Sequence, residues 1–155
     1  MSTPKPSQPI RSIACAVDFS PASHEALLFA ARLASRDHAK LTLLHVVPLP
    51  VYFLPDAFVP MPPAAVFAAD DAARAQLAKW QQEAQQAGAG EVGGFLATGQ
   101  PAAEVLRWCA TEKPDMLVLG QRGLSALEAM LLGSVADRVV RSAHCPVLVV
   151  PAKAA

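Results

Sequence analysis

The chain has 155 residues, the usual size of a single domain, and 13 Lys and Arg balance 13 Asp and Glu, so its formal net charge is zero. This balance argues against broad electrostatic binding to nucleic acids or to an anionic membrane surface, because both need a clustered excess of positive charge. With 53% hydrophobic and 17% charged residues, most of the chain has enough apolar surface to fold.

The sequence predicts one domain over residues 10–151, flanked by a flexible tail at 1–9 and a short C-terminal tail at 152–155. Neither a signal peptide nor a run of about 18 apolar residues is found, so we expect no membrane segment. Three widely spaced cysteines without a CxxC pair favour a reducing cytoplasm over a disulfide framework or a zinc site.

The first predicted elements are a buried strand, a helix and a second strand. Residues 10–17 are mostly apolar, which is typical of a strand buried on both faces. Ser20 and Pro21 follow as N-cap and first helical residue, and apolar positions spaced by three and four predict a helix over 21–36. Residues 41–47 form the next predicted strand, which Pro48 stops.

The segment 48–63 is rich in proline and also carries apolar and aromatic residues. Because proline removes hydrogen-bond donors and fixes φ, we expect a long irregular loop here rather than a regular element. Long loops of this kind often serve as lids or binding segments, so a lid and a partner-docking segment both remain open.

The second half of the chain continues the alternation of helices and strands. A helical stripe that includes Leu77 and Trp80 predicts a helix over 65–87, and the glycines after it end that helix. The remaining predicted elements are a strand at 91–98, a helix from Pro101 to Lys113, a strand at 115–119, a helix at 134–142 and a strand at 146–150.

This alternation predicts an α/β fold in which five parallel strands lie between two helical layers. Ligands of such sheets lie outside the carboxyl ends of the strands, where the strand order reverses. We therefore expect the site to use loops that directly follow strands, including residues 18–20 and the loop that begins at Gly120.

The loop from Gly120 carries the most informative motif of the chain. Gly120 and Gly123 are followed, nine residues after the second glycine, by Gly133 and Ser134, and a helix begins there. Glycines allow a tight turn and a close backbone approach to a ligand. A helix start presents free N–H groups and a positive dipole end, while the Ser134 hydroxyl can cap the helix or donate to a phosphate oxygen. Together these features predict a cradle for a phosphate chain.

The pattern Gly120-x2-Gly123-x9-Gly133-Ser134 resembles the nucleotide-binding signature of the ATP-binding branch of the universal stress protein family. Residues 16–20, 44–46 and 145–151 also resemble that family, and the likeness covers roughly residues 10–151. The resemblance implies a three-layer sandwich with strand order 3-2-1-4-5, so that the switch point lies between the first and fourth strands.

By the same resemblance, the cofactor is ATP, and in some family members a divalent cation such as Mg²⁺ arrives with its phosphates. The adenine and ribose would lie by Ala16, Val17 and Asp18, with Val46 and Leu119 as apolar walls. The phosphates would meet Gly120, Arg122, Gly123, Gly133, Ser134, Val135 and Ala136.

Several of these side chains have a second interpretation from the residues alone. Arg122 either neutralises a phosphate or is a solvated loop charge. Asp18 either accepts hydrogen bonds from ribose or adenine or is a turn residue after a strand. His45 ends the second predicted strand and either lines the pocket or does not, whereas His24 and His38 are expected to be solvated.

Three functions follow from this reading. The first is a stress-response or signalling protein that acts through its ATP-bound state with at most slow hydrolysis. The second is a weak ATPase or phosphotransfer enzyme that uses Asp18 and Arg122, although no Walker A or GxSxG motif is present. The third is a dimeric interaction module with a vestigial nucleotide site.

We expect a homodimer through the apolar last strand, Val147–Val150, because it would form an open sheet edge.

Overall fold

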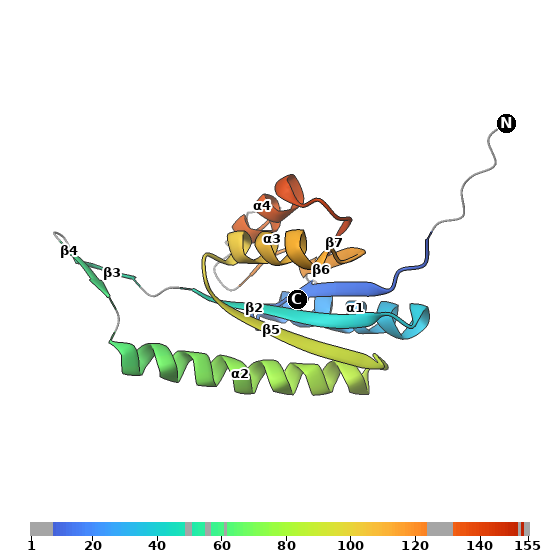
Figure 1. Cartoon of the computed structure of the whole chain (residues 1–155), viewed down its shortest axis with the longest axis horizontal. Coiled ribbons are helices and arrows are strands. Elements are labelled where there is room, and N and C mark those ends of the chain that lie inside the picture. The colour runs from blue at the N-terminus through green and yellow to red at the C-terminus, as the bar shows by residue number, and fades with distance from the viewer. Residues whose placement is uncertain are drawn as a thin grey trace.

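A five-stranded parallel sheet forms the centre of the molecule (Figure 1). The computed structural model describes residues 8–48, 51–54, 57–60, 62–123, 132–151 and 153. The sheet order is β5-β2-β1-β6-β7, which is 3-2-1-4-5 when its five strands are numbered along the chain, so the predicted topology is confirmed. The strands are β1 (Ser12–Ala16), β2 (Lys40–Pro48), β5 (Glu91–Gly99), β6 (Met116–Gly120) and β7 (Val147–Val150).

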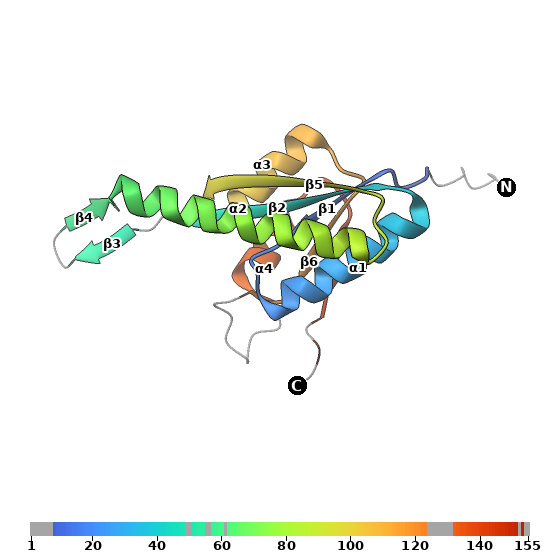
Figure 2. The ribbon, with the colours of Figure 1, turned by 90° about the horizontal axis from the view of Figure 1, so that it is seen from below.

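Two helices cover each face of this sheet. The helices α1 (Pro21–Asp37) and α2 (Pro63–Gln86) lie on one face, and Figure 2 shows them across that face. The opposite face carries α3 (Pro101–Glu112) and α4 (Ser134–Ser142) (Figure 1). The predicted three-layer α/β arrangement is therefore present.

Each helical layer packs a separate apolar cluster against the sheet. Leu27 and Trp80 join strand residues such as Leu41 in the α1–α2 cluster, whereas Val105 and Val139 join Leu117 in the α3–α4 cluster. β1 lies in the middle of the sheet, and Ala14 and Cys15 are fully buried, so the prediction of a strand buried on both faces is confirmed. This packing holds the carboxyl ends of the strands in fixed positions.

The start of α1 follows the sequence signals closely. Ser20 is the N-cap, its Oγ accepts the N–H of Ser23 at 3.1 Å, and Pro21 is the first helical residue. Between β1 and this cap, Phe19 takes φ 63°, a left-handed conformation that is uncommon for a residue other than glycine. This residue turns the chain sharply from the strand into the helix, a feature that the sequence pattern does not predict.

The prediction of an irregular loop at 48–63 is wrong for the residues that the structure describes. β2 runs on through Pro48, and the two short strands β3 (Val51–Leu54) and β4 (Ala57–Pro60) pair as an antiparallel hairpin beside the start of α2 (Figure 1). The prolines do not prevent this because they stand at element ends: Pro48 and Pro60 close strands, and Pro63 opens a helix, where no intrahelical donor is needed.

Two further predictions concern the ends of the chain and the membrane. The predicted tails lie largely outside the described residues, which begin at residue 8 and include 153 as the last. None of the helices in the described ranges combines the length and the apolar character that crossing a membrane requires.

Candidate functional site

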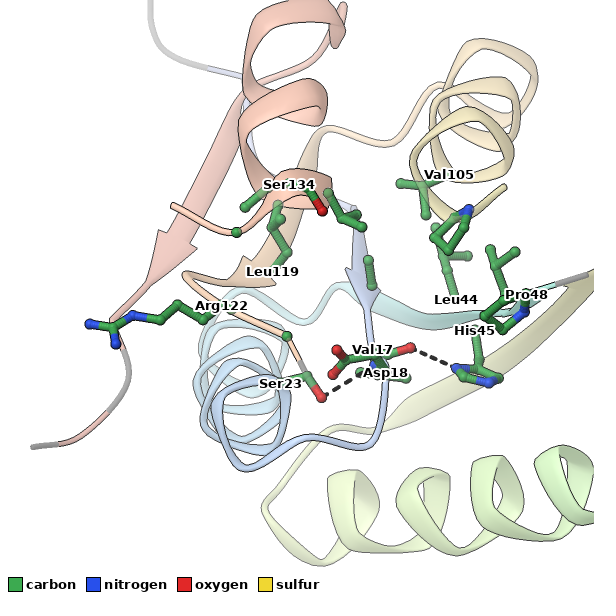
Figure 3. Close-up of a pocket in the computed structure, with 18 residues that line it drawn as sticks. Val17, Asp18, Ser23, Leu44, His45, Pro48, Val105, Leu119, Arg122 and Ser134 are labelled. Carbon is green, nitrogen blue, oxygen red and sulfur yellow. Dashed lines mark hydrogen bonds between the residues drawn. The ribbon is translucent and has the colours of Figure 1, made fainter. Parts of the chain in front are cut away.

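A cavity of about 380 Å³ lies at the carboxyl ends of β1 and β6, where the strand order reverses (Figure 3). Its walls come from the β1–α1 turn, the end of β2, the first turns of α3 and the loop between β6 and α4. The lining residues are Ala16, Val17, Asp18, Ser23, Leu44, His45, Val46, Pro48, Pro101, Val105, Leu119, Gly120, Arg122, Gly123, Gly133, Ser134, Val135 and Ala136.

All twelve residues predicted for nucleotide binding line this one cavity. His45, which the sequence left open, lines it as well. Five lining residues were not predicted. Leu44 could have been found, because it shares a strand face with Val46 two positions away. Pro101 and Val105 lie one turn apart on α3, and only the packing of α3 over the sheet brings them to the site. Ser23 and Pro48 complete the set.

Gly120 and Gly123 allow close approaches that larger residues would prevent. A Cβ on Gly120 would lie 2.9 Å from the carbonyl carbon and oxygen of Ala22, in the first turn of α1. A Cβ on Gly123 would overlap Oδ2 of Asp18. The glycine motif therefore brings the loop after β6 against the loop after β1, and residues of both loops line the cavity.

Asp18 is held by the turn that leads into α1. Its Oδ1 accepts the N–H of Ser20 at 3.0 Å, and its own N–H donates to Oγ of Ser23 at 3.3 Å (Figure 3). The turn-residue interpretation of Asp18 is thus correct, and it is compatible with a binding role because the same carboxylate lies on the cavity wall.

The helix α4 begins at the cavity. Gly133 is its N-cap, and the first-turn residues Ser134, Val135 and Ala136 line the cavity. No side chain of the described residues caps this end, so Ser134 is the first helical residue and not the capping residue that the sequence allowed. The N–H of Gly133 donates to the carbonyl of Gln121 at 2.8 Å, which closes the glycine loop onto itself. The positive end of the helix dipole is left facing the cavity.

The Arg122 side chain points away from the cavity centre in Figure 3, although the residue belongs to the lining. Its guanidinium extends to the side opposite Asp18 and His45. Phosphate neutralisation by Arg122 would therefore need a change of rotamer, whereas the first turn of α4, including Ser134, already lines the cavity.

His45 is a buried member of the cavity wall. Its Nδ1 lies 2.8 Å from the carbonyl oxygen of Val17, and its ring packs on that of Phe19 with centroids 4.2 Å apart. Burial lowers the pKa of His45, and the Val17 carbonyl and the Asp18 charge oppose this only in part. The ring is thus neutral near pH 7, with Nδ1–H donating to Val17 and Nε2 available as an acceptor.

We expect the free energy of unfolding to fall on acidification because of His45. The unfolded chain protonates this residue near its ordinary pKa of about 6.5, whereas the folded state takes up the proton only at lower pH, so the unfolded state binds more protons in between. Urea unfolding of the wild type and His45→Gln at about pH 7.5 and about pH 5.5 tests this. The stability difference between the two proteins should shift against the wild type at the lower pH, and a constant difference would contradict the prediction.

His24 in α1 and His38 directly after it differ in their exposure to solvent. His38 is exposed, as expected. His24 is only partly exposed, and its Nε2 lies 2.6 Å from Oε2 of Glu83 on α2, so the expectation of simple solvation is wrong for this residue. The His24 ring also meets Trp80 edge to face, which is a second contact between α1 and α2.

Across the described ranges, no cluster of three His, Cys, Asp or Glu side chains is placed to hold a metal ion. Asp18 is the carboxylate of the cavity lining. A cation at this site would therefore need further ligands, such as the oxygens of a bound phosphate chain.

Sequence comparison places the chain beside universal stress proteins. The sequence model of the universal stress protein family matches residues 9–151. Universal stress protein YxiE of Bacillus subtilis is 31% identical over 152 residues, which cover 87% of this chain and 95% of that protein. Universal stress protein MJ0531 of Methanocaldococcus jannaschii is 49% identical over 55 residues, a match that spans 36% of this chain and only 32% of that relative.

Solved structures have the same architecture. The universal stress protein UspA from Lactobacillus plantarum superposes with a TM-score of 0.80 at 26% identity, covering 92% of this chain and 99% of that one. A universal stress protein in complex with cAMP gives 0.68 at 27% identity, covering 94% and 100%. A universal stress protein from Archaeoglobus fulgidus in complex with dAMP gives 0.67 at 20% identity, covering 92% and 99%, a likeness of fold alone.

Proposed function

Because the chain belongs to the universal stress protein family, we propose that it binds an adenine nucleotide, ATP, in the cavity at the carboxyl edge of its sheet. The observation that carries this proposal is the gathering of all twelve predicted binding residues around one cavity with the α4 N-terminus at its wall. The relative in complex with cAMP supports an adenine nucleotide as the ligand class.

The cavity offers different surfaces to the parts of such a ligand. Val46, Val105 and Leu119 belong to the apolar cluster under α3 and α4 and provide walls for the base. The Asp18 carboxylate accepts hydrogen bonds from ribose hydroxyls. The glycine loop and the first turn of α4 donate backbone N–H groups to the phosphates. Mg²⁺ would arrive with the triphosphate rather than occupy a preformed protein site.

Calorimetric titration of the full chain with ATP tests this proposal. Binding at micromolar to millimolar nucleotide is expected, and co-purified nucleotide should appear in the mass spectrum of the denatured supernatant. No heat of binding at millimolar ATP would contradict it. Steady-state phosphate release then separates a binding protein from an ATPase, and turnover that survives in Asp18→Ala would show that Asp18 has no catalytic role.

We propose further that the ATP-bound state is the form that acts in stress response or signalling, in the cytoplasm. Family membership supports the biological setting. The cavity wall includes the start of α4 and the loop after β6. A bound nucleotide contacts both segments and can through them alter the surface that a partner meets.

Self-association through β7 forms the last part of the proposal. Among the strands that the structure describes, β7 lies at one end of the sheet and pairs only with β6. The carbonyls of Pro146 and Val150 accept hydrogen bonds from Leu117 and Gln121, so the alternating residues Val147 and Val149 direct their backbone groups to the open edge. An apolar strand with an open edge can pair with a second copy about a two-fold axis.

We expect Val149→Pro to yield a monomer. Proline removes the N–H that faces the open edge and leaves the hydrogen bonds to β6 in place, since edge strands tolerate proline on their solvent side. Val149→Ala is the matched control, because it shortens the side chain and keeps the N–H. Light scattering of size-separated protein should show a dimer for the wild type and the alanine variant, and a dimer that persists in Val149→Pro would rule out this interface.

A further inference from the structure

A second cavity, of about 370 Å³, lies at the opposite end of the strands from the nucleotide cavity. The last turns of α3, the end of α4 and the residues that lead into β7 form its walls. Cys109 of α3 and Cys145, two residues before β7, both line it. Neither residue takes part in the nucleotide site.

The two cysteines lie on the wall of the same cavity although they are far apart in the sequence. Cys145 is close enough to Cys109 to contribute to the raised pKa of its thiol. Cys109 belongs to the apolar cluster under α3 and α4, and Cys145 packs against that cluster. Both are free thiols in this structure. A pair of neighbouring thiols at the wall of one cavity has what a reversible disulfide needs: a nearby second thiol and an entry path for an oxidant.

We propose that Cys109 and Cys145 form a redox-active pair that a hydroperoxide converts into a disulfide between α3 and the segment before β7. The oxidant enters through the second cavity, where Lys113 and His144 place polar groups. The product is a covalent link between α3 and the segment before β7, which pack together in the apolar cluster under α3 and α4.

The different exposure of the two thiols sets the order of the steps. Cys145 is partly exposed and meets the oxidant first, whereas Cys109 is 7% exposed. Burial, followed by the neighbouring Cys145, raises the pKa of the Cys109 thiol to about 12, so that it stays protonated and acts second. This order assigns Cys145 the attack on the peroxide and Cys109 the closing of the disulfide.

The two steps balance with hydroperoxide as the named oxidant. The Cys145 sulfur attacks the peroxide O–O bond, which breaks to give a sulfenic acid and releases an alcohol, or water from hydrogen peroxide. The Cys109 sulfur then attacks the sulfenic sulfur, the S–S bond forms, and the departing hydroxide takes the Cys109 proton and leaves as water. Two electrons pass from the thiols to the peroxide oxygens.

Cys15 is a matched internal control. It lies in the middle of β1 within the α1–α2 cluster, is fully buried and faces neither cavity. Burial raises the pKa of its thiol to about 12 as well. A reagent that oxidises cysteines without regard to position would treat Cys15 and Cys109 alike, whereas the proposed pair leaves Cys15 reduced.

The test is peroxide treatment of the full chain, followed by thiol counting and peptide mapping. Trypsin places the three cysteines in separate peptides, 12–32, 108–122 and 142–153, because the Lys113–Pro114 bond resists cleavage. The expected result is loss of two of the three thiols and a disulfide-linked pair of the peptides 108–122 and 142–153, reversed by dithiothreitol. Cys15→Ser should behave in the same way.

Two other results would overturn the proposal. One is over-oxidation of Cys145 to a sulfinic acid in the wild type without any linked peptides. The other is a link between Cys145 residues of two chains in place of the intramolecular one.

The variant Cys109→Ser gives a second test. We expect a dimedone probe to trap more Cys145 sulfenic acid in this variant than in the wild type, because the residue that consumes the sulfenic acid is gone. Equal trapping in both proteins would also count against the pair.

Discussion

Gly123→Ala is expected to weaken ATP binding at least about tenfold, which corresponds to about 1.4 kcal/mol. The added Cβ would overlap Oδ2 of Asp18, so either the carboxylate or the glycine loop must move. Both line the proposed nucleotide cavity, and a displaced loop carries its backbone N–H groups away from the phosphates. The atom in the way is the tip of a side chain, so we expect only a small change in the free energy of unfolding.

Gly90→Ala provides the control for this substitution. Gly90 follows α2 at the far end of the sheet, and a Cβ there would meet nothing within 4 Å. Calorimetric titration should give the same Kd for Gly90→Ala and the wild type and a larger Kd for Gly123→Ala. Unchanged ATP affinity in Gly123→Ala would mean that the glycine loop does not hold the phosphates.

Much of the fold is predictable from the sequence because its signals are local and agree with one another. The N-cap Ser20, the helix-opening Pro21 and the helical stripe that includes Leu77 and Trp80 each fix an element without knowledge of the rest. The alternation of strands and helices then leaves few topologies, because parallel crossovers are right-handed. The strand order, and with it the switch point between the first and fourth strands, came from the resemblance to the universal stress protein family and not from these local signals.

The features that were missed depend on contacts between distant segments. The hairpin of β3 and β4 could not be read from its prolines, since only the pairing of residues 51–54 with 57–60 shows that the prolines stand at strand ends. Pro101 and Val105 reach the cavity because α3 packs over the sheet. The direction of the Arg122 side chain is a matter of rotamer choice, about which the sequence carries no signal.

The balanced charge of the chain makes a specific demand on the proposed site. With 13 positive and 13 negative side chains, a phosphate chain cannot be held by a general excess of positive potential. The orientation of Arg122 leaves this task to the first turn of α4 and to the backbone of the glycine loop. Binding through backbone N–H groups depends on the exact path of the chain more than on side-chain identity, so changes that move the backbone should have the largest effects.

Gly120→Ala is therefore expected to affect both stability and binding. Its Cβ would lie 2.9 Å from the carbonyl carbon and oxygen of Ala22 and 3.1 Å from the Ser23 nitrogen, all backbone atoms of the first turn of α1. No rotamer change can relieve this overlap, so β6 and α1 must separate. Overpacking of this kind costs about 1–3 kcal/mol, and each kcal/mol lowers the Tm of a domain of this size by about 2–4 °C.

Gly93→Ala isolates the steric part of this effect. Gly93 also lies within a strand, β5, but a Cβ there would find its nearest neighbour, Thr42 Oγ1, at 3.7 Å, which is ordinary contact. Urea unfolding should show a clear loss for Gly120→Ala and little change for Gly93→Ala. Saturating ATP should restore part of the stability that Gly120→Ala loses only if this variant still binds ATP in its folded state. Equal stability of the two variants would mean that the close approach of β6 to α1 is not a constraint on this fold.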